Sequence, residues 1–384
     1  MRKALALILA AILFLDAVCL GVIFFSDAKQ LPYKKEDEDE IFKRASVVAV
    51  GNNIIGDEIL RQASSRSNST GYDFAFLYEN TAQDIEEADE AIITHEGVFS
   101  SQHNVSGYPL YNAPADLGKE LKKTGFDTVS IATNHILDYG EQGLVNTCTF
   151  LKDEIGLNPV GAYTSRADTT VPVIRNVNGI KIAYIAFTQS TNEHSLPENS
   201  DAYLLLSQYE SKISEMINEA KAKADFVIVC AHWGDEYGEE ITAEQENTAK
   251  KLGDWGADVI IGTHPHELQK IEYITNSDGT QTLVAYSLGN FVSGQEKGEL
   301  LLGGMLKFDL VKNTSSGEVS VENVNMEGVV THYGVDMSKI RLYKLSEYTQ
   351  ALADVHGVKA RTEDFSLKYL KKLFEDRIDN EFTR

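Results

Sequence analysis

The chain has 384 residues, of which 43% are hydrophobic, so it can bury a large core as one big domain or two smaller ones. Its formal net charge of −23 excludes nucleic acid as a partner, because nucleic-acid phosphates are bound through clustered Lys and Arg. The same charge disfavours broad contact with any polyanion, which would need a local basic patch or a bound cation.

A membrane anchor is predicted at the start of the chain. The apolar run from Ala4 to Phe25 has 22 residues and follows two basic residues, and a run of this length can span a bilayer. Its apolar end favours an uncleaved signal anchor over a cleaved signal peptide. Acidic residues follow, which places the rest of the chain outside the cytoplasm. We predict a cell-membrane protein with one N-terminal span in residues 1–29, a charged stalk in 30–45 and an extracytoplasmic main domain.

From residue 46 onward, short β-rich apolar runs alternate with amphipathic stretches, which predicts one α/β domain over residues 46–330. Residues 331–384 are expected to form a helical extension. Asn178-Gly179 and Asp278-Gly279 predict hairpin turns. The expected strands are 47–50, 91–94, 128–132, 171–177, 180–187, 226–231, 258–262, 268–274 and 281–286, and the expected helices are 114–124, 141–154, 207–223 and 242–255.

Histidines follow three of the predicted strands. His135, His232 and the pair His264 and His266 each come directly after an apolar run. Open α/β sheets place ligands at the carboxyl ends of strands, and neutral imidazole binds zinc, iron and manganese. Two imidazoles separated by one residue in an extended segment point the same way. A lone histidine is more often a core or surface residue, but three such strand ends together predict a metal site.

Oxygen ligands are expected beside these imidazoles, because histidines alone leave a divalent cation under-neutralised. Asn52 follows the first predicted strand and can offer an amide oxygen. Glu96 follows the second and can bridge two metals, or it is a solvated loop carboxylate. The neighbouring His95 is expected to point to the opposite side of its strand.

Six short motifs follow one another along the chain: Gly51-Asn52-Asn53, Glu96, Ala132–His135 with Asp138–Gly140, His232–Tyr237, Gly262–His266 and Tyr286–Phe291. In this order they resemble the motifs of the CapA family of poly-γ-glutamate capsule synthesis proteins, over about residues 46–310. The family is similar in fold to the calcineurin-like metallophosphoesterases. The resemblance therefore implies a metallo-dependent phosphatase-like α/β/β/α sandwich with a metal centre at the strand ends.

The resemblance also assigns the metal ligands residue by residue. Asn134, His135, His232, His264 and His266 match the family's metal shell, and Glu96 matches its acidic ligand. The family usually has Asp where this chain has Asn52. An amide oxygen is a neutral and weaker ligand for a hard dication, so one of two metals is expected to bind loosely or not at all.

Three further residues are candidates for catalysis. His135 is the expected proton donor to the leaving group. Asp138 orients the His135 ring through its second nitrogen, or it caps a turn. Glu236, or its neighbour Asp235, is a candidate general acid beside the metal.

Substrate contacts are expected from four positions near the same strand ends. Trp233 and Tyr237 can stack on a ligand, although core packing is the favoured alternative for Trp233. Ser287 and Asn290 follow the strand at 281–286 and are expected to line the pocket.

Two functions of different classes follow from these patterns. The first is metal-assisted hydrolysis, with one or two divalent ions of manganese, iron or zinc and a phosphoester as the substrate class that the fold resemblance implies. The amide bond of poly-γ-glutamate is the less favoured substrate. The second is a non-catalytic component, tethered to the membrane, that binds capsule polymer or a capsule synthase partner through a weakened metal site.

Overall fold

The computed structural model of the protein describes residues 41–67 and 70–383. The expected anchor, and all of the expected stalk before residue 41, lie outside the described residues. Contacts between residues cluster into two units, Met1–Ile41 and Phe42–Arg384, and the second unit is compact. Within residues 41–67 and 70–383, no helix has the length and apolarity needed to cross a bilayer.

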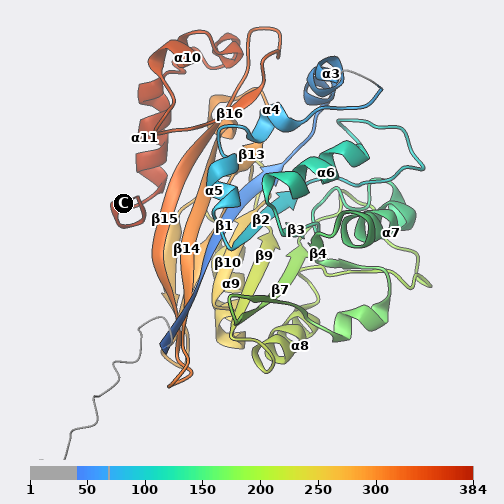
Figure 1. Ribbon diagram of the computed structural model, residues 1–384, viewed down its shortest axis with the longest axis vertical. Helices are drawn as coiled ribbons and strands as arrows, with labels where there is room; N and C mark the ends of the chain where they lie inside the picture. The colour runs from blue at the N-terminus through green and yellow to red at the C-terminus, as the bar shows by residue number, and fades with distance from the viewer. Residues whose placement is uncertain (1–40, 68–69, 384) are drawn as a thin grey trace, which may run out of the picture. The chain divides into compact units, whose positions relative to one another are not determined.

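The first of two large sheets has eight strands, in the order β16-β15-β14-β1-β2-β3-β4, with β13 paired to β1 (Figure 1). Strands β1 to β4 run parallel to one another and β13 runs parallel to β1, whereas the pairs β1–β14, β14–β15 and β15–β16 are antiparallel. The bounds are β1 (Phe42–Asn53), β2 (Glu90–His95), β3 (Thr128–Ser130), β4 (Asn158–Val160), β13 (Asn290–Val292), β14 (Leu302–Asn313), β15 (Val319–His332) and β16 (Arg341–Lys344).

The second sheet has six strands, in the order β11-β12-β10-β9-β7-β6. Both predicted hairpins are confirmed, because β6 pairs antiparallel with β7 and β11 pairs antiparallel with β12. Asn178 and Gly179 have φ values of 52° and 81°, as the turn between two hairpin strands requires. The bounds are β6 (Val173–Val177), β7 (Ile180–Thr188), β9 (Phe226–His232), β10 (Val259–Thr263), β11 (Ile271–Thr275) and β12 (Gln281–Ala285), and β5 (Ala162–Tyr163) pairs separately with β8 (Tyr203–Leu204).

The helices largely match their predicted positions. The helix predicted at 141–154 divides into an α-helix, Gly140–Thr149, and a π-helical turn, Phe150–Ile155. Gly125 ends α6 at φ 105°, a value that only glycine adopts readily. The bounds are α3 (Asp57–Arg66), α4 (Ala75–Tyr78), α5 (Ala82–Glu86), α6 (Ala115–Thr124), α7 (Gly140–Thr149), α8 (Glu210–Lys221), α9 (Ala243–Trp255), α10 (Gln350–Asp354) and α11 (Leu367–Arg377).

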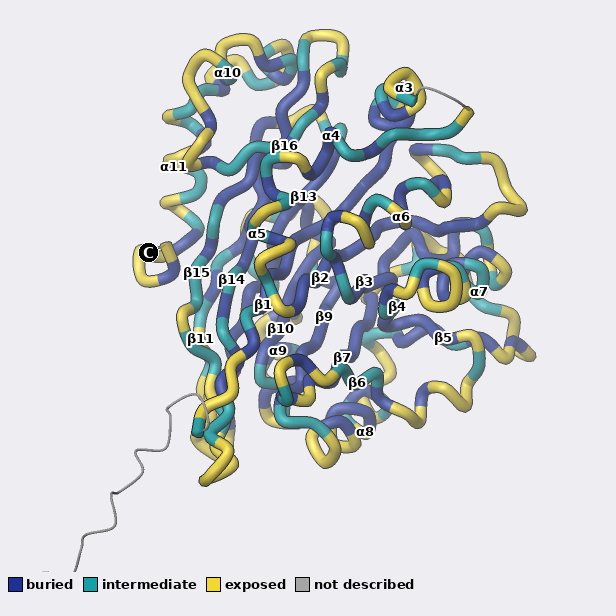
Figure 2. Tube along the Cα trace, in the orientation of Figure 1, coloured by how far each residue is buried: buried dark blue, intermediate teal, exposed yellow. Residues whose placement is uncertain are grey.

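Alternate residues along the strands of the second sheet point to opposite faces, one toward the first sheet and one toward helices α8 and α9. Ile182 and Tyr184 belong to the core shared with the first sheet, whereas Ala183, Ile185 and Phe187 pack with α8 and α9. Helices α4, α5 and α6 lie over the first sheet in Figure 1, and the strands are the buried part of the trace in Figure 2. The two sheets therefore pack face to face between helices, which is the expected α/β/β/α sandwich.

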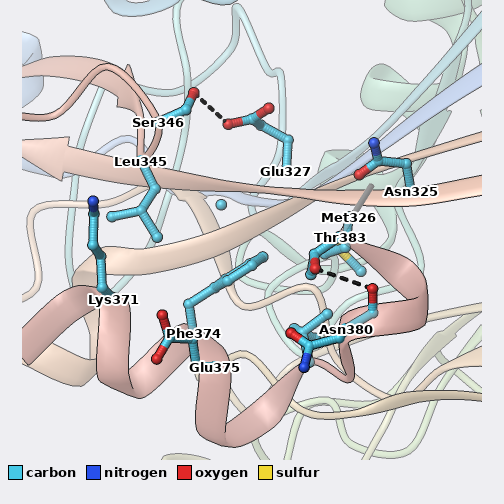
Figure 3. A pocket seen from close by; sticks show the side chains of 12 residues that line it. Asn325, Met326, Glu327, Leu345, Ser346, Lys371, Phe374, Glu375, Asn380 and Thr383 are labelled. Atoms are coloured by element: carbon cyan, nitrogen blue, oxygen red, sulfur yellow. Dashed lines mark hydrogen bonds between the residues drawn. The ribbon is translucent and has the colours of Figure 1, made fainter.

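Residues after 331 close one side of the first sheet. Helix α11 lies beside β15, and a groove of about 420 Å³ separates them (Figure 3). Phe374 and Leu345 line this groove from opposite sides. The helix is held more firmly near its end, where Arg377 donates to the Leu268 carbonyl oxygen at 2.7 Å.

Two buried histidines in this region should make the fold sensitive to acid. Burial lowers the pKa of His332 and of His356 to about 4, so both stay neutral in the folded chain while the unfolded chain takes up protons below pH 6.5. Each histidine should therefore cost about 2 kcal/mol of unfolding free energy between pH 7.5 and pH 5. Urea unfolding at both pH values should show a smaller loss in His332→Gln than in the unaltered chain.

Candidate metal centre

A cavity of about 250 Å³ lies at the carboxyl ends of the parallel strands. It opens where β1 and β2 end, so the chain segments that follow these strands reach it. Glu96, His135 and His266 form part of its wall, together with residues that precede and begin α3. Its lining residues are Ile54, Gly56, Asp57, Glu58, Glu96, Tyr108, Tyr111, His135, Glu236, Tyr237, His266, Ser293, Gly294 and Gln295.

Glu96 is the carboxylate at the centre of the histidines. Its Oε1 atom lies 3.8 Å from His135 Nε2 and 4.0 Å from His266 Nε2. The residue is only 2% exposed, and its Oε2 atom has no hydrogen-bond partner among the described residues. Burial raises the pKa of this carboxyl, and the two histidines act against that shift. Glu96 is thus a buried carboxylate rather than a solvated loop residue.

The His264 and His266 segment has a strained backbone. Their φ values are 100° and 62°, in the left-handed region that non-glycine residues rarely adopt, and the ring centres are 6.2 Å apart. The expectation of an extended segment is therefore wrong, because the chain turns sharply after β10 at His264-Pro265-His266. Backbone strain of this kind costs about 1–3 kcal/mol for each residue and clusters at functional sites.

His232 and Asn134 form a second pair of ligand-type atoms. His232 Nε2 lies 2.9 Å from the amide oxygen of Asn134, and His232 Nδ1 lies 3.0 Å from the Thr263 hydroxyl. The His232 and His264 rings are 4.7 Å apart between centres. Burial lowers the pKa of His232, and it lowers that of His264 to about 4, so both imidazoles are neutral and suited to bind a cation.

Asn52 lies at the end of β1 beside His266. Its Nδ2 atom is 3.2 Å from His266 Nδ1, and that same ring nitrogen is 3.0 Å from the amide oxygen of Asn290. The Asn52 Oδ1 atom is buried without a hydrogen-bond partner in the described part of the chain. Asn290 therefore contacts a candidate ligand, and Asn52 presents a free oxygen.

His135 is held by the carboxylate predicted to orient it. Its Nδ1 atom lies 2.8 Å from Asp138 Oδ2, which also accepts a hydrogen bond from the Tyr111 backbone N–H at 2.7 Å. Burial lowers the pKa of His135, but the Asp138 hydrogen bond and the Glu96 charge outweigh it, so the net shift is upward. The imidazole is therefore held in one orientation, with its pKa raised.

Glu236 contacts His266 rather than His135. Its Oε1 atom lies 3.5 Å from His266 Nε2, and this interaction lowers the pKa of Glu236 to about 2. The structure thus places Glu236 beside His266, and its general-acid role stays a prediction.

Several of the residues considered near the site do not line this cavity. Trp233 is 2% exposed and donates its indole N–H to the Tyr286 carbonyl oxygen, so the core-packing alternative describes its position. Ser287 is fully buried and accepts from the Gly289 N–H. His95 stacks on Phe99. The other residues outside the lining are Asn52, Asn134, Asp138, His232, His264 and Asn290.

Some contributing residues carry no signal in the sequence. Asn192 lies in the loop after β7, and its side chain is 3.3 Å from that of Asn134 and 3.5 Å from His135 Nε2. Tyr111 packs edge-on against the His135 ring at 4.8 Å between centres. Neither residue follows a predicted strand end within one of the motifs, so only the tertiary structure brings them to the site.

The nitrogen and oxygen atoms at the strand ends are of the types that bind a divalent cation. In residues 41–67 and 70–383, no group of three or more His, Cys, Asp or Glu side chains is arranged to hold a metal ion. Donor atoms are nevertheless left without partners, namely Glu96 Oε2, Asn52 Oδ1 and His264 Nδ1. Buried polar atoms normally have partners, and imidazole with carboxylate and amide oxygen is a ligand set for transition metals. These residues fit a metal ion, with amide oxygens as some of its ligands.

Comparison with known proteins gives consistent matches. The family model described as "Bacterial capsule synthesis protein PGA_cap" matches residues 46–295. The capsule biosynthesis protein CapA of Bacillus anthracis is 37% identical over 48% of this chain and 44% of its own length. The PGA biosynthesis protein CapA of Bacillus subtilis is 36% identical over 51% of this chain and 50% of its own length. The chain thus spans about half the length of these relatives.

Among solved structures, the NAD nucleotidase of Haemophilus influenzae is similar at 14% identity and a TM-score of 0.49, over 87% of this chain and 66% of that one.

The two packed sheets form the expected α/β/β/α sandwich, and ligand-type side chains gather at its strand ends. The chain belongs to the PGA_cap family of bacterial capsule synthesis proteins.

Proposed function

We propose that this chain is a membrane-anchored, extracytoplasmic hydrolase of capsule synthesis that uses one or two divalent metal ions to cleave a phosphoester-type bond. The observation that supports it is the set of buried, unpartnered donor atoms of Asn52, Glu96 and His264 at the strand ends. Leaving such atoms unpaired costs about 1–3 kcal/mol each, which a bound cation would offset. Membrane attachment rests on the apolar run in residues 1–29.

The residues of this chain have distinct roles in that chemistry. A divalent ion, when bound, would supply activation of water and polarisation of the scissile group. Glu96, Asn134, His232, His264 and His266 would hold the ion, with Asn52 as a weak ligand. His135 donates its Nε2 proton to the leaving oxygen, since Asp138 fixes the ring and the pKa of His135 is raised.

Metal analysis and a hydrolysis assay on the same sample test the proposal. The 384-residue chain, purified in detergent, is incubated with manganese or zinc, desalted and analysed by mass spectrometry for bound metal. Hydrolysis of bis(p-nitrophenyl) phosphate is then measured. Bound metal with metal-dependent release of p-nitrophenol is expected. Chain that binds no metal, or that binds it without hydrolysing any phosphoester, would contradict the enzyme proposal.

Asn52→Asp is expected to strengthen the site. A carboxylate would replace the unpartnered Asn52 Oδ1 beside His266, and a charged oxygen is a better ligand for a hard dication. We expect about tenfold tighter metal binding, the size of effect that changes around metal ligands produce, with a rise in phosphodiesterase activity. Titration with a metal-sensitive dye measures the affinity. Unchanged affinity would show that Asn52 is no ligand. Asn323→Asp, on β15 and outside the cavity lining, is the matched control.

Asp138→Asn is expected to lower kcat by about 10–100-fold while metal content stays near normal. The amide keeps the shape but loses the charge that raises the pKa of His135. Because the His135 pKa then falls, the basic limb of the activity–pH profile should move to lower pH. A lower kcat with an unmoved profile would show that Asp138 only caps its turn.

A second candidate is a non-catalytic, membrane-tethered component that binds capsule polymer or a synthase partner. Asn52 favours it, because a neutral amide stands where the family usually has Asp. The assay above separates the two functions, since a binding component holds a metal without turning over phosphoesters.

A further inference from the structure

Carboxylates and tyrosines dominate the cavity outside its histidines. No Lys or Arg of the described residues lines it, although phosphate groups are usually bound by such side chains. An anionic part of a substrate would therefore depend on the metal centre for its counter-charge. The acidic and aromatic lining residues are Asp57, Glu58, Glu96, Glu236, Tyr108, Tyr111 and Tyr237.

The Glu58 carboxylate fills a space that exists because Gly56 and Gly294 have no side chains. A β-carbon at Gly294 would lie 1.7 Å from Glu58 Oε1, and one at Gly56 would lie 2.3 Å from it. The carboxylate therefore rests directly on both glycine backbones at the cavity wall. Burial raises the pKa of Glu58, and the electrostatic attraction of Arg61 does not offset it. A cationic ligand group beside Glu58 would add to the partial stabilisation that Arg61 and a backbone hydrogen bond give its ionised form.

Two tyrosines extend this region toward solvent. Tyr108 is 77% exposed and Tyr237 is 47% exposed, although both line the cavity. Lys297 Nζ already lies 5.6 Å from the centre of the Tyr237 ring, a distance typical of a cation–π contact. Glu96, which is 2% exposed, also lines the cavity. These features together indicate a ligand with a positive group.

We propose that the part of the cavity formed by Glu58, Tyr108 and Tyr237 binds a primary ammonium group of the substrate, next to the bond that the metal centre cleaves. The inference rests on the proposed hydrolytic function and names its substrate class, an amine-bearing ester. Glu58 accepts charge-assisted hydrogen bonds from the ammonium, which are stronger than neutral ones. The exposed tyrosine rings supply cation–π attraction.

Binding and turnover of matched esters test this proposal. The metal-loaded 384-residue chain is titrated by calorimetry with 2-aminoethyl phosphate and with its N-acetyl derivative, which lacks the charge. Hydrolysis of the corresponding p-nitrophenyl diesters is measured in parallel. We expect at least about tenfold tighter binding of the free amine, the usual size of a hydrogen bond to a charged group, and a similar preference in kcat/KM.

Two variants should abolish the preference by different routes. Glu58→Gln removes the charge. Gly294→Ala leaves the charge in place but puts a β-carbon where Glu58 Oε1 now lies, which displaces the carboxylate. Glu86→Gln removes a charge from the exposed end of α5 and should keep the preference. Thermal unfolding confirms that each variant is folded.

Equal binding of the amine and its N-acetyl derivative would overturn the proposal, as would a preference that survives Glu58→Gln. A preference in binding without hydrolysis of either diester would uphold the ammonium site and overturn the hydrolytic function. Calorimetry therefore separates failure of this inference from failure of the proposed function.

Discussion

The double substitution His264→Ala with His266→Ala is expected to leave the chain without bound metal and without phosphoesterase activity. Both imidazoles belong to a segment whose left-handed backbone brings them to the strand ends, and the His264 Nδ1 atom has no partner in the described residues. Loss of one outer-shell partner already costs about 10–100-fold in metal affinity. Loss of two proposed ligands should therefore reduce activity by more than a hundredfold, measured by metal mass spectrometry and p-nitrophenol release.

The matched control replaces two histidines that are exposed and outside the cavity, His103→Ala with His194→Ala. This variant should keep its metal and its activity. Undiminished metal content in the His264 and His266 variant would place the metal elsewhere in the protein. Thermal unfolding of both variants shows whether any loss of metal reflects a loss of fold.

The second large effect is expected at Arg377, at the end of α11. Its side chain is only 7% exposed and forms a 2.6 Å ion pair with Glu267, the residue that follows His266. Removing one partner of a buried ion pair costs about 3–5 kcal/mol, because the other charge stays buried and unpaired. Arg377→Ala should lower the free energy of unfolding by this amount in urea titrations. It should also weaken metal binding, since Glu267 and Leu268 then lose their support.

Two further variants test whether the buried ion pair causes the loss of stability in Arg377→Ala. Arg361→Ala breaks the exposed pair with Glu296 and should cost less than about 1 kcal/mol. Combining Arg377→Leu with Glu267→Leu removes both charges and should recover most of the lost stability, as replacement of buried ion pairs by apolar residues often does. A double variant as unstable as Arg377→Ala would show that the Leu268 hydrogen bond, rather than the charge pair, holds the helix.

The sequence by itself determined the order of the elements and the residue types at the strand ends. Alternating apolar runs predicted the strands, and Asn178-Gly179 and Asp278-Gly279 predicted both hairpins, since these features depend on neighbouring residues alone. Placing His135, His232, His264 and His266 after strands required no tertiary information. The motif order also indicated the sandwich and the family.

Only the tertiary structure decided how these residues meet. The turn at His264-Pro265-His266 replaces an expected extended segment, because the loop must reach the cavity within a few residues of β10. Asn192 joins the site from a loop far along the chain, and Arg377 of α11 reaches Glu267, the neighbour of His266. Such contacts depend on the packing of two sheets and their covering helices, and local periodicity carries no information about them. The same packing places Trp233 in the core and Glu58 on its two glycines.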